Sequence, residues 1–431
     1  MSPTRRDFLI GSTAAGVFGG LAPRATAFAT ARTLSDAELA QQPPAVAGVD
    51  YRPVITPNGA ALPFRVVAGV KVFHLVVENV RHEFAPGLVA ECWGYNGRVH
   101  GPTLEAVEGD RVRIYVTNRL VAPTTVHWHG LAVPNGMDGV GGLTQRAIEP
   151  GETFRYEFTL RQHGTFMYHS HHDEMTQMAL GLMGLFVIHP RKPASPPPDR
   201  DYAYLLSEWR ITPGAHRPDP NEMTDFNVLT LNAKIHPATE KLFARRGERV
   251  RIRFGNLSAM DHHPMHLHGH AFQVVETDGG VIPEAGRWPE VSVLVPVGST
   301  RTIEFVATEP GDWALHCHMT HHVMTQMGHG TPNLIGVDAG KFDEALLANV
   351  PQYEGMGMST HGDVDDSRPV NSLAMLGSPG PMGYITMSGM FTVLQVRESG
   401  DAASAGWFTH PEGTVARPAT ESELSADGIR V

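Results

Sequence analysis

One ten-residue pattern occurs twice in this chain: Gly109-Asp110-Arg111-Val112-Arg113-Ile114-Tyr115-Val116-Thr117-Asn118 and Gly247-Glu248-Arg249-Val250-Arg251-Ile252-Arg253-Phe254-Gly255-Asn256. In both copies apolar and polar residues alternate with a period of two, which is typical of a strand with one buried face. A His-x-His pair follows each copy, His127/His129 in the first and His266/His268 in the second. The repeat therefore predicts a duplicated β-structure.

The duplication extends further along both copies. Gly-Glu-Thr-Phe-Arg-Tyr-Glu-Phe at 151–158 is echoed by Gly-Ser-Thr-Arg-Thr-Ile-Glu-Phe at 298–305. Each of these leads through a Gly turn to a second pair, His169/His171 and His316/His318. Four matches in the same order indicate a repeated unit.

Short strands separated by turn signals predict an all-β chain of two sandwiches, residues 51–190 and 200–338. A Pro-rich linker, residues 191–199, joins them. Residues 339–431 are expected to form a Gly- and Met-rich C-terminal extension with one strand-like run, Phe391 to Val396.

The composition sets outer limits on function. Hydrophobic residues make up 42% of the 431 residues and charged residues 18%, so folded cores are expected. A net charge of −11 disfavours a nucleic-acid partner, which requires a basic face. The two cysteines, Cys92 and Cys317, provide no disulfide framework, and Cys92 is expected to be a buried, inert small hydrophobe.

The N-terminus has the features of a targeting segment. Paired arginines, Arg5 and Arg6, precede an apolar stretch from Phe8 to Leu21 and the small residues Ala25-Thr26-Ala27. This pattern predicts a twin-arginine signal peptide over residues 1–29 and a periplasmic or secreted protein. An apolar stretch of about 14 residues is too short for a membrane span, and none is expected after signal removal.

The histidines indicate metal binding. In a strand, residues i and i+2 project to one side, so each His-x-His pair offers two imidazoles to the same side. Four pairs supply enough imidazoles for two or three copper or zinc ions. The middle residues of the triplets face the opposite side: Trp128, Ser170, Leu267 and Cys317.

Cys317 can therefore bind a different metal from the one its neighbours bind. His263, His322 and Met327 are the additional ligands expected around it. One thiolate, two imidazoles and a thioether are the donors of a blue-copper site.

These motifs resemble the four copper motifs of multicopper oxidases, over roughly residues 66–330: His127-Trp-His-Gly130, His169-Ser-His171, His263-Pro-Met-His-Leu-His-Gly-His270 and His316-Cys-His-Met-Thr-His-His322. The resemblance implies two tandem cupredoxin-like Greek-key sandwiches carrying a type 1 copper and a trinuclear cluster. It assigns type 1 copper to His263, Cys317, His322 and Met327, type 2 to His127 and His266, and the type 3 pair to His129, His169, His171, His268, His316 and His318.

The implied activity is laccase-like: one-electron oxidation of a phenol or aromatic amine, coupled to reduction of O2 to water. Asp138 matches an acidic position near the cluster and is expected to supply protons, the alternative being an ordinary turn Asp before Gly. Oxidation of organic molecules is expected to need an accessible imidazole, either His263 or His322. His321 and Gln326 depart from the family pattern around type 1 copper and leave its potential and substrate open.

Several alternatives remain. Ser170 occupies the position that matches Cys317, so one type 1 copper is expected per chain, in the second sandwich. Copper nitrite reductases instead carry the blue site in the first domain. A non-enzymatic copper-binding protein is a further alternative. An oxidase of cuprous or manganous ions is suggested by methionines and aspartates near the C-terminus: Met356, Met358, Met375, Met382, Met387, Met390, Asp363, Asp365 and Asp366.

The resemblance also bears on assembly. Two-domain family members resemble small laccases, which are homotrimers with clusters between neighbouring chains. The linker of about nine residues is short, whereas the histidine pairs of the two copies must face each other across an interface. The two histidine pairs of the first copy in one chain are therefore expected to meet the two pairs of the second copy in the next: His127, His129, His169 and His171 with His266, His268, His316 and His318.

Overall fold

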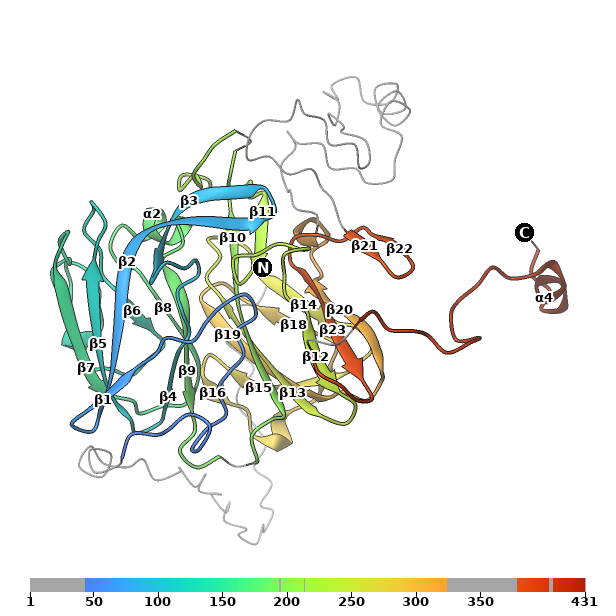
Figure 1. Cartoon of the computed structure of the whole chain (residues 1–431), viewed down its shortest axis with the longest axis horizontal. Coiled ribbons are helices and arrows are strands. Elements are labelled where there is room, and N and C mark those ends of the chain that lie inside the picture. Colours follow the sequence, from blue (N-terminus) through green and yellow to red (C-terminus); the bar gives the residue numbers. More distant parts are fainter. Residues whose placement is uncertain (1–42, 194, 213, 324–377, 403–405, 431) are drawn as a thin grey trace, which may run out of the picture.

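The computed structural model describes residues 43–193, 195–212, 214–323, 378–402 and 406–430. Two β-sandwiches lie side by side, the first in blue and green and the second mostly in yellow and orange (Figure 1). This arrangement confirms the predicted all-β class with two tandem sandwiches. The predicted signal peptide, residues 1–29, and the predicted ligand Met327 lie outside the described residues.

The first sandwich consists of a five-stranded and a four-stranded sheet. The larger sheet has the order β1-β2-β5-β7 with β3 paired to β2, and the smaller has the order β4-β9-β8-β6. Their bounds are β1 Arg65–Val67, β2 Val70–Ala85, β3 Leu88–Tyr95, β4 Leu104–Val107, β5 Arg111–Asn118, β6 His127–His129, β7 Thr153–Thr159, β8 Gly164–His169 and β9 Met183–His189. A short helix, α2 (Glu174–Ala179), and the 3-10 turn η1 (Asn135–Met137) lie in its connections.

The second sandwich consists of a seven-stranded and a five-stranded sheet. The first of these has the order β11-β10-β13-β19-β15-β16 with β17 on β15, and the other has the order β12-β23-β20-β14-β18. Their bounds are β10 Arg200–Trp209, β11 Val228–Leu231, β12 Leu242–Arg245, β13 Arg249–Asn256, β14 His263–Leu267, β15 Phe272–Thr277, β16 Gly280–Val281, β17 Pro289–Glu290, β18 Ser292–Val295, β19 Ser299–Val306, β20 Gly311–Cys317 and β23 Phe391–Arg397. The remaining elements are the hairpin β21 (Ser378–Gly380) and β22 (Gly383–Ile385), the turns η2 (Glu284–Gly286) and η3 (Thr320–Val323), and helix α4 (Glu421–Ala426).

The two copies match strand by strand. β2 is parallel to β5, which is antiparallel to β7, and β10, β13 and β19 repeat this pattern. In the smaller sheet of each sandwich, β4-β9-β8-β6 corresponds to β12-β23-β20-β14. The ten-residue repeat becomes β5 and β13, and the second repeat becomes β7 and β19, as the sequence pattern predicts.

The second sandwich differs from the predicted division at residue 338. β23 pairs with β20 on one side and β12 on the other, so a strand of the predicted extension belongs to this sandwich. In the five-stranded sheet, β23 lies between β12 and β20, the position that β9 has between β4 and β8 in the first sandwich. β9 follows β8 closely in sequence, whereas residues 318–390 separate β20 from β23.

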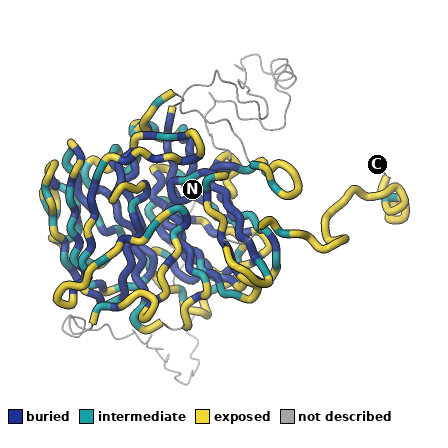
Figure 2. The backbone as a smooth tube through the Cα atoms, viewed as in Figure 1, coloured by how far each residue is buried: buried dark blue, intermediate teal, exposed yellow. Residues whose placement is uncertain are grey.

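The sandwiches share a largely apolar interface. One cluster joins Val80, Phe84 and Cys92 to Trp209 and Ile235, and another joins Met167, Met183 and Leu185 to Ala203 and Leu205. Within this interface Arg253 of β13 is buried, where it donates to the Asp201 carboxylate and to Thr165 Oγ1 of the first sandwich. β13 is therefore covered on both faces, unlike the half-exposed β5, because its polar side packs against the other sandwich (Figure 2).

Candidate metal centres

The histidine triplets lie on strands β6, β8, β14 and β20 or directly after their ends. Their middle residues, Trp128, Ser170, Leu267 and Cys317, are all at most 1% exposed. This confirms that the middle residues face the interior, as strand alternation predicts.

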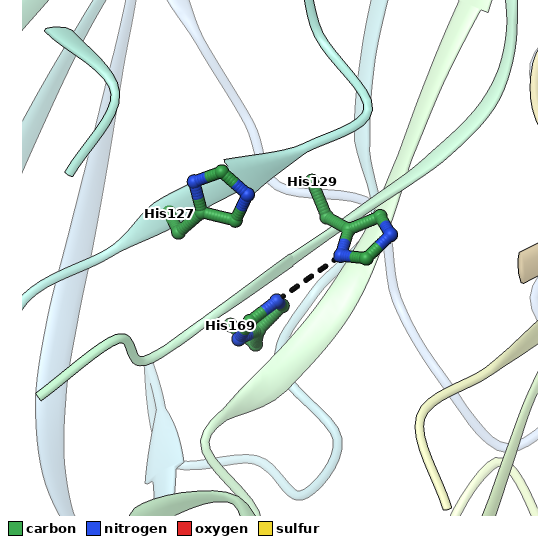
Figure 3. A group of neighbouring side chains, drawn as sticks. All are labelled: His127, His129 and His169. Carbon is green, nitrogen blue, oxygen red and sulfur yellow. Dashed lines mark hydrogen bonds between the residues drawn. The ribbon is translucent and has the colours of Figure 1, made fainter. Parts of the chain in front are cut away.

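The first histidine set consists of His127, His129, His169 and His171, from adjacent strands β6 and β8 and the residues after them. Its ring centroids lie 5.4–6.0 Å apart. One ligand atom from each of His127, His129 and His169 lies within 4.8 Å of the others. Figure 3 shows the three rings facing one another, with His129 Nδ1 3.2 Å from His169 Nε2.

Backbone carbonyls fix which nitrogen of each ring is free. His127 Nδ1 donates to Asp138 O at 2.8 Å, His169 Nδ1 to Ser170 O at 2.8 Å, and His129 Nε2 to the carbonyl of Gly298 at 2.9 Å. The second nitrogen of each ring remains available to a metal, since metal-binding histidines commonly donate their other N–H in this way. Burial lowers the pKa of His169 to about 3, which keeps its imidazole neutral.

The second histidine set consists of His266, His268, His316 and His318, from β14, β20 and the residues after them. Its ring centroids lie 4.8–5.6 Å apart. His316 Nδ1 donates to Cys317 O and His266 Nδ1 to Val291 O, so the Nε2 atom of each ring points away from these carbonyls. His316 Nε2 lies 3.1 Å from His268 Nε2. His268 and His318 are exposed, and this half of the arrangement therefore opens to the surface.

Within the described ranges, no ring contact joins the first histidine set to the second. The first set lines a cavity of about 490 Å³ whose opposite wall comes from the second sandwich, including Trp209, Leu257 and Gly298. None of the four imidazoles of the second set lines this cavity. Each set is thus half of the arrangement that the sequence predicts.

A buried trio lies on the other side of Cys317. His263 Nδ1 and His322 Nδ1 are 3.1 Å apart, and Cys317 Sγ lies 3.8 Å and 3.4 Å from them. All three side chains are fully buried. Burial lowers the pKa of His263 to about 3 and raises that of Cys317 to about 12. Three converging donors away from water fit a cation, and a sulfur with two imidazoles fits copper.

Polar groups cover the far side of both imidazoles of this trio. Ser258 Oγ lies 2.7 Å from His263 Nε2, and Asp261 Oδ2 lies 3.4 Å from His322 Nε2. The expected accessible imidazole is therefore not found among the described residues, because these groups and the fold cover both rings. The Asp261 side chain is 22% exposed and reaches the surface in their place.

Glu208 forms hydrogen bonds with the backbone at Asp261. Its Oε1 accepts from the backbone N–H groups of Met260 and Asp261, at 2.6 and 3.2 Å. Burial and the adjacent Asp261 carboxylate raise the pKa of Glu208 to about 8. Asp261, Glu208 and Ser258 were not predicted from sequence; only the position of Asp261, two residues before His263, offered a signal.

In the first sandwich, hydrogen-bonded polar side chains occupy the position that corresponds to the Cys317 site. Ser170 Oγ donates to Gln177 Oε1, and Thr124 Oγ1 donates to the same oxygen at 2.7 Å. Both hydroxyls and Gln177 are buried. Ser170 thus brings no thiolate to the place that matches the Cys317 site.

Asp138 lies beside the first histidine set, as predicted. Its Oδ1 is 3.5 Å from His127 Nδ1, and its backbone carbonyl is closer, at 2.8 Å. The carboxylate is 30% exposed, so it is in contact with solvent.

Two other expectations concern sulfur. Cys92 is 1% exposed in the interface cluster, where burial raises its pKa to about 12, as expected of an inert cysteine. Met390 is fully buried in the second core, whereas Met382 is 69% exposed. Met356, Met358 and Met375 lie outside the described residues.

Two tandem sandwiches with His-x-His motifs, and a buried cysteine close in space to two further imidazoles, define a class of copper proteins. Models of the multicopper oxidase family match residues 76–193 and 212–333. The chain belongs to the multicopper oxidase family.

Individual relatives agree with this placement. Copper resistance protein A of Escherichia coli is 31% identical over 234 residues, covering 43% of this chain and 38% of the relative. Copper resistance protein A of Pseudomonas syringae pv. tomato is 29% identical over 328 residues, covering 63% and 51%. The chain thus spans about half or less of the length of these relatives.

The match to one solved structure extends over a larger share of both chains. Blue copper oxidase from Nitrosomonas europaea has 25% identity and a TM-score of 0.56, covering 75% of this chain and 85% of that one. Among the described residues, no helix is long and apolar enough to cross a membrane.

Proposed function

We propose that this chain is a copper-dependent oxidase that couples one-electron oxidation of a small reductant to reduction of O2 to two waters. The observation that carries the proposal is the position of Cys317. Its sulfur belongs to the buried trio, while its two peptide neighbours, His316 and His318, belong to the second histidine set. One residue thus covalently links the two kinds of site.

The ligands are assigned by motif and by the groupings above. His263, Cys317, His322 and, by motif alone, Met327 would hold a type 1 copper; His127 and His266 would hold type 2; and His129, His169, His171, His268, His316 and His318 would hold the type 3 pair. When bound, copper supplies the electron storage and the activation of O2 that no side chain provides.

The chain's own residues perform three tasks. The fold buries the trio and excludes water from it. Backbone carbonyls keep the imidazoles oriented, with one nitrogen free. Asp138, partly exposed beside His127, passes protons from solvent toward the site where O2 is reduced.

The reductant is proposed to be a phenol or aromatic amine, as in laccases. One observation favours a second candidate reductant, a cuprous or manganous ion. The imidazoles of His263 and His322 are both buried, and the partly exposed group next to His322 is the carboxylate of Asp261. The named copper resistance relatives support the same alternative.

Because each histidine set is half a cluster, we further propose that the chain assembles as a homotrimer. The first set of one protomer then faces the second set of its neighbour, and three such contacts close a ring. Export by the twin-arginine route to the periplasm or beyond is part of the same proposal.

The test combines four measurements on copper-loaded protein. The proposal expects an intense blue absorption band, four coppers per chain and the mass of a trimer in light scattering. It also expects steady-state consumption of O2 with a phenol, Cu(I) or Mn(II). Protein that is colourless at full copper loading, or that reduces nitrite but not O2, would refute the assignment.

A further inference from the structure

The chain ends in an arm that leaves the body of the molecule. Residues 406–408 are still fixed to the second sandwich: Phe408 N donates to Asp312 Oδ2 at 2.7 Å, and the Lys241 ammonium lies 3.5 Å from the centroid of the Trp407 ring. We call the following residues, 409–430, the C-terminal arm. The arm projects away from both sandwiches (Figure 1) and is almost entirely exposed (Figure 2).

Helix α4, near the end of this arm, is capped at its start. Thr420 and Glu423 form a reciprocal capping box, and the Glu423 carboxylate also pairs with both terminal nitrogens of Arg417. Such a box satisfies two of the amide groups that a helix start leaves unpaired.

The other end of α4 is capped as well. Ile429 N donates to Leu424 O at 2.8 Å and Gly428 N to Ser425 O at 3.2 Å, with Gly428 at a φ of +72°. This pair of bonds is a Schellman motif, which commonly brings its two flanking apolar side chains together, here those of Leu424 and Ile429.

A helix of six residues is too short to be stable on its own in water. Both ends of α4 are nevertheless satisfied. In the part of the chain that the structure describes, α4 has no buried side chain, and Ile429 just after it is 56% exposed. Local structure specified in this way lowers the ordering cost of binding to another surface. These features indicate a preformed docking element.

We propose that the C-terminal arm binds the first sandwich of a neighbouring copy, in a groove beside β2. The groove has a volume of about 950 Å³ and is lined by apolar side chains, among them Leu62, Phe64 and Val72. Arg65, Arg98 and His74 also line it, and no carboxylate does.

The charges of the two partners are complementary. The arm carries four acidic groups, Glu412, Glu421, Glu423 and Asp427, against two basic ones, Arg417 and Arg430, so its net charge is 2 − 4 = −2. The cationic side chains among the groove's lining suit this sign, and the apolar side chains of the lining suit Leu424 and Ile429.

The position of the arm also fits. This step rests on the proposed assembly, in which the second sandwich of one protomer abuts the first sandwich of the next. The arm starts on the second sandwich, and residues 409–420, when extended, reach about 40 Å, enough to cross onto a neighbour. The arm would then strengthen the same contact that completes the histidine sets.

Cysteine cross-linking tests the docking directly. Glu421→Cys combined with Arg65→Cys should give disulfide-linked multimers on a non-reducing gel; the native Cys92 and Cys317 are buried and do not compete. Glu421→Cys with Glu149→Cys, an exposed position of the first sandwich outside the groove, is the matched control and should give at least several-fold less product. A cross-link within one chain, or equal yields from both pairs, would overturn the proposal.

Removal of residues 409–431 provides the second measurement. In light scattering over a dilution series, the shortened chain should dissociate at a concentration at least tenfold higher than the full chain. If both chains are trimers with the same dissociation behaviour, the arm proposal is wrong while the assembly proposal stands. If the full chain is monomeric at every concentration, both are wrong.

Discussion

His322 Nε2 lies 3.4 Å from Asp261 Oδ2, while Nδ1 of the same ring lies 3.4 Å from Cys317 Sγ. The two nitrogens of one buried imidazole thus face a carboxylate on one side and the thiol on the other. The carboxylate favours a proton on Nε2 and leaves Nδ1 as the ligand atom, so the tautomer suits a metal at Cys317.

Replacement of Asp261 tests this relationship. Asp261→Asn should leave the protein folded and blue but weaken copper binding at the trio by about 10–100-fold, because the carboxylate beside His322 Nε2 loses its charge. Competition with a chelator, followed through the blue band, measures the effect. Asp278→Asn, on the same sandwich but away from the trio, should leave the affinity unchanged, and an Asp261→Asn affinity equal to that of this control would remove Asp261 from the site.

The two buried cysteines form a matched pair for the spectrum. Cys317→Ser should abolish the blue band, because no thiolate remains to transfer charge to copper. Cys92→Ser should keep the full band per copper, since Cys92 lies in the interface between the sandwiches. Visible absorption of both copper-loaded variants decides the matter, and a blue Cys317→Ser protein would contradict the assignment.

The proton supply predicted for Asp138 uses its side chain and not its backbone. Its backbone carbonyl holds His127, so Asp138→Asn should leave that ring oriented. Reoxidation of the reduced protein by O2 should nevertheless slow by about 10²-fold or more, with the blue colour retained. Stopped-flow reoxidation measures this rate, and an unchanged rate would show that Asp138 is an ordinary turn residue.

His82 predicts acid sensitivity that does not depend on copper ligands. Burial lowers its pKa from 6.5 to about 4, so the unfolded chain binds more protons between these values. The contribution of His82 to the free energy of unfolding is therefore fully present above pH 6.5. This contribution, up to about 3 kcal/mol, is lost as the pH falls toward 4.

Denaturant unfolding of the metal-free protein across this pH range provides the measurement. His82→Gln should reduce the pH dependence by the contribution of one buried imidazole, whereas His74→Gln, at an exposed position of the same strand, should leave it unchanged. Equal slopes for wild type and His82→Gln would show that the ring is not held neutral by the fold.

Much of the fold could be predicted because period-two patterning and duplication are local signals. They gave β5, β7, β13 and β19 and the inward-facing middle residues of the triplets. The strand-like run from Phe391 to Val396 was predicted and is confirmed as β23, but its place in the second sandwich was not. Strand pairing across residues 318–390 depends on which sheet position is vacant rather than on local pattern.

The candidate site divides in the same way. Histidine spacing predicted which imidazoles share a side of a strand, and the structure groups them accordingly. The roles of Asp261, Glu208 and Ser258 come from tertiary packing around His263 and His322, which carries no sequence period. The burial of both imidazoles has the same origin, so sequence spacing could not reveal it.

If each cluster is shared between two chains, two variants that are inactive alone should restore activity when they are mixed. One variant carries His129→Ala and His171→Ala in the first histidine set, and the other carries His268→Ala and His318→Ala in the second. Either alone should be inactive in O2 consumption, whereas co-expression should restore about a quarter of the wild-type activity, because random mixed trimers regain one intact site each. If the mixture is as inactive as either variant alone, the clusters are not shared between chains and the proposed assembly is wrong.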